Sequence, residues 1–155
     1  MITNIIIGFF IPWIFGIYLY KRAPVIILLI CPITAIMSTV INAVGYQLEF
    51  WRFTPLIKNV ATLSSLPFDI GFYPVMTSYL IYWIRQNNQY PFLKIVCIGL
   101  LTTILELIAY LFGKVEYSNH WNIGWTFVSY VIPYILIYLY YRLLSRYVYS
   151  IISKK

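Results

Sequence analysis

Acidic residues, histidine and cysteine are scarce in this sequence. Its 155 residues include four Asp and Glu together, one His and two Cys. One histidine cannot build the usual zinc site, and Cys31 and Cys97 form no CxxC pair that would indicate a thiol oxidoreductase. The HExxH, GxSxG and glycine-rich phosphate-loop motifs are also missing. The sequence therefore predicts no metal and no cofactor, and it favours a role that is not enzymatic.

Apolar residues dominate what is present. The chain is 62% hydrophobic and 20% aromatic, and only 10% of its residues are charged, which is typical of an integral membrane protein. It has no Ser, Gly or Pro-rich linker, so residues 1–155 are expected to form a single membrane domain. The net charge of +7 does not predict nucleic-acid binding, because the basic residues stand at the ends of apolar runs, where they would orient helices.

Five apolar stretches are near the roughly 20 residues that cross a hydrocarbon core. They cover about residues 1–20, 23–46, 66–84, 95–113 and 124–141. The first has neither a basic start nor a small-residue cleavage site, so it is expected to be a retained span. The predicted fold is all-α, a polytopic bundle of about five transmembrane helices in a cytoplasmic membrane.

The basic residues predict an orientation. With the amino terminus outside, the inner side holds Lys21, Arg22, Arg85, Lys94, Arg142, Arg146, Lys154 and Lys155, and the outer side holds Arg52, Lys58 and Lys114. Short cytoplasmic loops collect Lys and Arg, so the carboxyl terminus is expected in the cytoplasm.

The link "QLEFWRFTPLIKNVATLSS" between the second and third spans is too long and too apolar for a simple turn. Thr54 can cap a helix that begins with Pro55, and the following apolar residues fall on one side at helical spacing. A short interfacial helix is the prediction, with a re-entrant segment as the alternative. Trp51 is expected to anchor it at the headgroups, and Trp121 and Trp125 are expected to anchor the start of the last span.

Small and polar residues also recur at helical spacing within the spans, as in the row Tyr130, Tyr134 and Tyr138. Such rows are predicted to be helix-packing faces. Two carboxylates need a further explanation. Asp69 follows Ser64, Ser65 and Pro67 at the expected start of the third span, where it is predicted to cap free backbone amides.

Glu106 has no helix end nearby. At 1.5 Å per residue it lies about 18 Å from Lys94 and about 12 Å from Lys114, and a charged carboxylate at such depth costs at least ~2.5 kcal/mol. It must therefore be protonated, paired or facing water. Tyr110 is one turn beyond it on the same face, and the candidate ion-pair partners are Arg52, Lys58 and His120.

A resemblance adds to these observations. The segments "FWRFTPL", "LPFDIGFYPVMTSYL", "ILELIAYLFGKVEY" and "HWNIGWTFVSYVI", in this order over spans two to five, resemble a family of small multipass membrane proteins common in spore-forming Bacilli and Clostridia. The family has no established activity. The resemblance implies that its shared positions correspond here to Trp51, Asp69, Pro74, Glu106 and Trp121 or Trp125. Leu107 follows Glu106 where members of the family have Pro.

Three function classes stay open. The first is a non-catalytic component of the envelope or of sporulation that binds a partner membrane protein, a second copy of itself or a lipid. The second is a small proton- or cation-linked carrier or binder that uses Glu106, helped by Asp69 and Tyr110, in an outward-facing cavity. The third and weakest is an enzyme acting on lipids or isoprenoids, with the two carboxylates as acid and base.

Overall fold

The computed structural model describes residues 2–54 and 61–152. The first half of the chain contains α1 (Ile2–Ile5), the π-helix η1 (Ile6–Phe10), α2 (Ile11–Arg22), α3 (Pro24–Gln47) and β1 (Trp51–Phe53). The second half contains the 3-10 helix η2 (Ala61–Ser64), the π-helix η3 (Phe68–Phe72), α4 (Tyr73–Gln86), α5 (Pro91–Leu111), β2 (Val115–Tyr117) and α6 (Ile123–Ile152).

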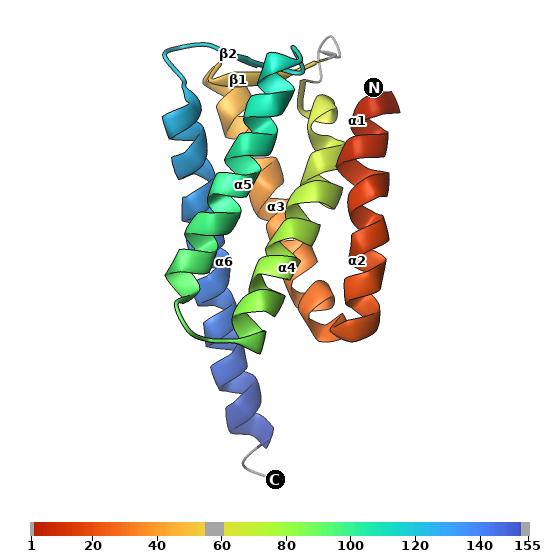
Figure 1. Cartoon of the computed structure of the whole chain (residues 1–155), viewed down its shortest axis with the longest axis vertical. Coiled ribbons are helices and arrows are strands. Elements are labelled where there is room, and N and C mark those ends of the chain that lie inside the picture. The colour runs from red at the N-terminus through yellow and green to blue at the C-terminus, as the bar shows by residue number, and fades with distance from the viewer. Residues whose placement is uncertain (1, 55–60, 153–155) are drawn as a thin grey trace.

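The helices lie side by side along one axis, with α4 between α2 and α5 (Figure 1). The amino terminus and the two strands are at one end, which we call the strand end. The turns between α2 and α3 and between α4 and α5 are at the opposite end. The prediction of a helical bundle is confirmed in this coarse form.

The number of predicted membrane spans was wrong. Four helical stretches of the described chain are long and apolar enough to cross a membrane, namely Ile2–Arg22, Pro24–Gln47, Pro91–Leu111 and Ile123–Tyr147. The expected third span, 66–84, is helical but is not among them. Its α4 portion has 14 residues, and Asp69, Thr77 and Ser78 within the stretch are buried. Because this helix is at the centre of the bundle, its sequence meets protein rather than lipid and can be more polar.

The core lies in the half of the bundle away from the strands. Fully buried aliphatic side chains from α2, α3, α4, α5 and α6 meet there, among them Leu19, Ile30, Leu80, Ile95 and Ile137. A smaller cluster is formed by three buried side chains of the strands themselves, Trp51, Phe53 and Val115. Between the two clusters the interior is polar.

The two strands were not predicted. β1 and β2 pair antiparallel, with Trp51 opposite Tyr117 and Phe53 opposite Val115. The helices before them end in the same way: Glu49 after α3 and Gly113 after α5 have positive φ, and the next amide bonds the carbonyl five residues back. This Schellman turn reverses the chain, so both segments leave their helices toward each other.

The expected interfacial helix is replaced in part by this sheet. Trp51–Phe53 is a strand and Ala61–Ser64 is a 3-10 helix. Residues 55–60, which would hold most of the predicted helix, lie outside the described residues, as does Lys58.

Two π-helices cross each other where the backbone approaches most closely. Each contains Ile-Gly-Phe, at 7–9 in η1 and at 70–72 in η3, and each is followed by a proline, Pro12 or Pro74. A proline cannot bond the carbonyl four residues back, and a π-turn accommodates the lost bond. The freed carbonyl of Ile70 accepts a hydrogen bond from the Trp13 indole at 3.0 Å, while that of Gly8 faces Gly71.

Candidate ligand site around Glu106

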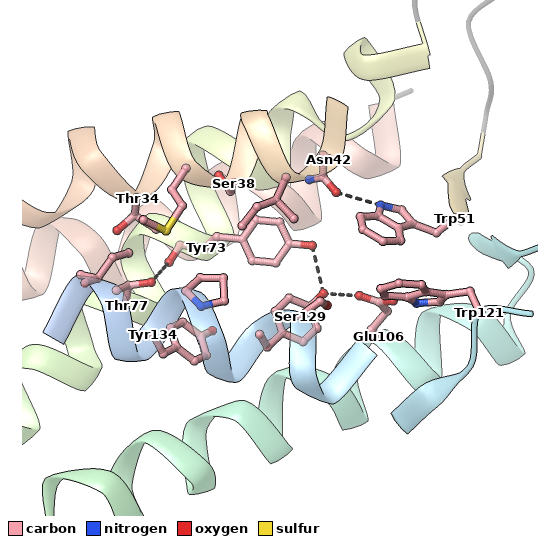
Figure 2. A pocket seen from close by; sticks show the side chains of 15 residues that line it. Thr34, Ser38, Asn42, Trp51, Tyr73, Thr77, Glu106, Trp121, Ser129 and Tyr134 are labelled. Carbon is pink, nitrogen blue, oxygen red and sulfur yellow. Dashed lines mark hydrogen bonds between the residues drawn. The ribbon is translucent and has the colours of Figure 1, made fainter. Parts of the chain in front are cut away.

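Glu106 is held by two tyrosines from different elements. Glu106 is on α5, and its Oε1 accepts a hydrogen bond from the Tyr117 hydroxyl of β2 at 2.7 Å. Its Oε2 accepts one from the Tyr130 hydroxyl of α6, which is in turn 3.2 Å from the Tyr73 hydroxyl of α4 (Figure 2). Since both oxygens accept hydrogen bonds, the arrangement suits an ionised carboxylate.

Tyr117 is fixed by a second set of contacts. The Thr126 hydroxyl donates to Tyr117 Oη at 3.2 Å, and the Trp121 indole donates to Thr126 Oγ1 at 2.9 Å. Burial first, and the neighbouring Glu106 carboxylate second, raise the pKa of the Tyr117 phenol. The phenol therefore keeps its proton and stays a donor to Glu106.

None of the cations expected to pair with Glu106 does so within the described chain. Arg52 instead forms an exposed ion pair with Glu49 at 3.0 Å. His120 lies in the exposed turn before α6, and Lys58 is outside the described residues. Tyr110 stacks on the Tyr117 ring at 4.8 Å and so supports a ligand of Glu106 without contacting the carboxylate itself.

Glu106 lies in the wall between two hollows. We call the first the inner cavity: it has a volume of about 50 Å³ and lies between α3, α4 and α6. We call the second the lateral cleft: it has a volume of about 490 Å³ and lies between η1, η3 and α5, under the strands. Glu106, Tyr73 and Tyr130 line both, so the carboxylate can be approached from either side.

The inner cavity is lined by polar groups and aromatic rings. Figure 2 shows Thr34, Ser38 and Asn42 along α3 on one side and Ser129 and Tyr134 on the other, with Trp51 and Trp121 side by side at one end. The two indole rings are 4.7 Å apart, centre to centre. The volume is enough for a few water molecules, which need about 10–15 Å³ each, and the lining offers them partners.

The lateral cleft is mainly apolar. Phe68 and Phe72 of η3 line its floor, Leu105 and Ile108 of α5 line one wall, and Ile7 of η1 lines the other. Its polar lining groups include Glu106, Thr102 and Asn4, with Lys114 at the strand end. Its volume is within the ~300–1,000 Å³ of small-molecule sites.

Asp69 does not cap its helix as predicted. Its Oδ1 accepts a hydrogen bond from Asn42 Nδ2 at 2.7 Å, and its Oδ2 accepts one from Ser65 Oγ at 3.0 Å. The side chain is 1% exposed. Asn42 also accepts a hydrogen bond from the Trp51 indole at 2.9 Å, so the carboxylate ties α3, η3 and β1 together.

Two of the three tryptophans, Trp51 and Trp121, differ from the expected headgroup anchors. Trp51 is 8% exposed, because its ring packs on Gly45 and Trp121 instead of on lipid. Trp121 is half-buried between Trp51 and Phe50. Trp125 is 56% exposed at the start of α6, which is compatible with the predicted position.

Sequence reasoning missed the partners of the two acids. Tyr117 carried no periodic signal, and its approach to Glu106 depends on the strand pairing. Tyr130 was assigned to packing, although it is one turn from Tyr134, whose hydroxyl is 2.9 Å from Thr102 Oγ1. A row of tyrosines opposite a row containing Thr102, Thr103 and Glu106 was the available signal.

The chain matches no family model, no curated protein and no solved structure in the comparisons with known proteins.

Proposed function

We propose that this membrane protein is a binder of a cationic ligand, and that Glu106 is its anionic contact. The observation that carries the proposal is a carboxylate held by two phenol donors, without a basic partner in residues 2–54 and 61–152, in the wall of two hollows. A carboxylate has about four lone-pair sites, so the hydroxyls that bond Glu106 leave at least one for a ligand.

The rings around Glu106 support a cation. Tyr73 and Tyr130 line both hollows, Trp51 and Trp121 line the inner cavity, and Phe68 and Phe72 line the cleft. A cation over an aromatic face gains about 0.5–1 kcal/mol at exposed sites and ~2 or more when desolvated. An ammonium group beside Glu106 would combine this attraction with a charge-assisted hydrogen bond or ion contact.

The carboxylates do not support the enzymatic alternative. Asp69 is bonded to Asn42 and Ser65, is 1% exposed and lines neither hollow, so it offers no second acid or base at the Glu106 site. A role in the envelope or in sporulation, and membership of the family named above, stay predictions. Such a role is compatible with ligand binding, because a sensor or carrier subunit would need the same site.

We also propose that the strand end of the bundle faces the outside of the cell. The helix ends beside the turns at the opposite end of the bundle carry four basic residues, Lys21, Arg22, Arg85 and Lys94. The part of α6 that leads away from the strands carries Arg142 and Arg146 (Figure 1). This distribution supports a cytoplasmic position for that end. Glu106 would then be reached from the outer half of the membrane.

The test measures the binding of three probes that each contain one phenyl ring and differ in charge. Benzyltrimethylammonium, benzyl alcohol and benzenesulfonate are titrated against the protein in lipid nanodiscs, with saturation-transfer NMR and empty nanodiscs as the blank. We expect specific binding of the cation, and a loss of about tenfold or more in the Glu106→Gln variant, because the trimethylammonium group has no N–H donor and contacts the carboxylate through its charge, an attraction of about 4 kcal/mol at 4 Å and an effective dielectric constant of 20.

Glu116→Gln is the matched control, since it removes one exposed negative charge from the adjacent strand. It should bind the cation like the wild type. Equal binding of the cation and benzyl alcohol, or equal affinities of the Glu106→Gln and Glu116→Gln variants, would refute the proposal.

A further inference from the structure

We infer that the ligand is a lipophilic organic cation whose apolar body occupies the lateral cleft while its charged nitrogen lies at Glu106. The inference rests on the proposed function and adds the class of ligand. It starts from the difference in size between the two hollows, about 490 Å³ against about 50 Å³. Only the cleft can hold a body of more than a few heavy atoms.

The cleft has one acidic lining residue in the described chain, and this residue is Glu106. Lys114 also lines the cleft but is exposed near the strands, eight residues later in the chain. The α5 helix ends at Leu111, about 7.5 Å of helix axis beyond Glu106, and Lys114 follows the chain reversal at Gly113. The cleft is therefore negative at its deep end and positive at its rim, so a cation is attracted inward past an apolar wall.

The lining between these charges suits an apolar body. Phe68, Phe72, Leu105, Ile108 and Ala109 contribute ring and aliphatic surface there. Burial of such surface gains about 25 cal/mol per Å² removed from water. A small hydrated cation would leave this surface unused, whereas a cation with an attached ring or alkyl chain would cover it.

The exposed side chains show where the cleft opens. Ile7 on one wall and Leu105, Ile108 and Phe112 on the other are all exposed, so the opening lies on the side of the bundle between η1 and α5. Figure 1 shows α1 and α5 on either side of the chain segment that leads into α4. In a membrane whose outer side is at the strands, this opening would face the acyl chains of the outer leaflet.

The test varies the size of the apolar body at constant charge. Tetramethylammonium, benzyltrimethylammonium and (4-phenylbutyl)trimethylammonium are titrated against the protein in nanodiscs, with empty nanodiscs subtracted. We expect the last to bind about tenfold or more tightly than the first in the wild type. Leu105→Trp should narrow the cleft and remove most of this gain, expressed as the ratio of the two affinities in the same variant.

Leu101→Trp is the matched control: Leu101 is on α5 one turn away, is 43% exposed against 40% for Leu105, and lies outside the cleft lining. It should keep the wild-type ratio. If tetramethylammonium binds through Glu106 but the affinity does not rise with size, or if both tryptophan variants keep the gain, the cleft assignment is wrong and the proposed function survives. If none of the cations binds, both fail.

Discussion

Replacing Gly71 by alanine tests the crossing on which the position of η3 depends. A Cβ atom at Gly71 would lie 2.2 Å from the Gly8 carbonyl oxygen and 2.7 Å from Phe9 Cα. Ordinary contacts begin near 3.4 Å, so the two π-helices would have to separate by about 1 Å. Both obstructing atoms belong to the backbone, and no change of rotamer can relieve the contact.

The expected cost follows from these contacts. Overpacking of a tight interior costs about 1–3 kcal/mol, and the Trp13 to Ile70 hydrogen bond across the same crossing adds about 0.5–1.5 kcal/mol if it breaks. The better helix propensity of alanine returns about 0.5–1 kcal/mol. The free energy of unfolding should therefore fall by about 0.5–4 kcal/mol, with a midpoint near 2 kcal/mol, for which a chain of this size loses roughly 4–8 °C in Tm.

The assay is thermal unfolding in detergent, followed by a thiol-reactive dye. Cys31 is buried and reports unfolding, and Cys97, which is exposed, is replaced by Ser in all samples. Gly124→Ala is the control, because the nearest atom to its added methyl is the end of the Asn122 side chain at 3.1 Å. A Tm for Gly71→Ala within 1 °C of that control would show that the crossing is not the tight contact described above.

Two further predictions follow from the polar contacts and the basic residues. Asn42→Leu should lower the free energy of unfolding by about 2–4 kcal/mol, because the Trp51 indole and one Asp69 oxygen lose their partner; Thr39→Val, which removes a bond within α3, should cost less than half as much in the same assay. Equal losses would show that the Asn42 bridge contributes nothing special. In intact cells that lack Cys97, an impermeant maleimide should label Glu116→Cys at once and Asn88→Cys only after permeabilisation, and the reverse pattern would overturn the proposed orientation.

Much of the fold could be predicted from single segments. The expected spans 1–20, 23–46, 95–113 and 124–141 agree with helical stretches Ile2–Arg22, Pro24–Gln47, Pro91–Leu111 and Ile123–Tyr147. Local hydropathy was sufficient there because each of these helices keeps large apolar side chains exposed on the outside of the bundle, as a helix in contact with lipid does. It failed for 66–84, since the polarity of that helix depends on the helices around it.

The candidate site divides in the same way. The sequence alone predicted that Glu106 lies within a helical span, and the structure places it in α5, five residues before that helix ends at Leu111. The sequence could not show which hydroxyls bond the carboxylate. Tyr117 is 11 residues away and Tyr130 is 24 residues away, and both reach it through strand pairing and helix packing.

The amino-acid sequence by itself thus determined that this is a bundle of long apolar helices with a carboxylate inside one of them, because composition and spacing are local properties. The tertiary structure decided that Asp69 is an enclosed structural group bonded to Asn42, and that Glu106 is the acid that borders open space. The sequence predicted a structural role for Asp69 and a partner or ligand for Glu106, but it did not show the contacts of either side chain. Asp69 is enclosed through its contact with Asn42, which is 27 residues away in the chain. Glu106 borders open space because the crossing of η1 and η3 leaves the cleft beside it.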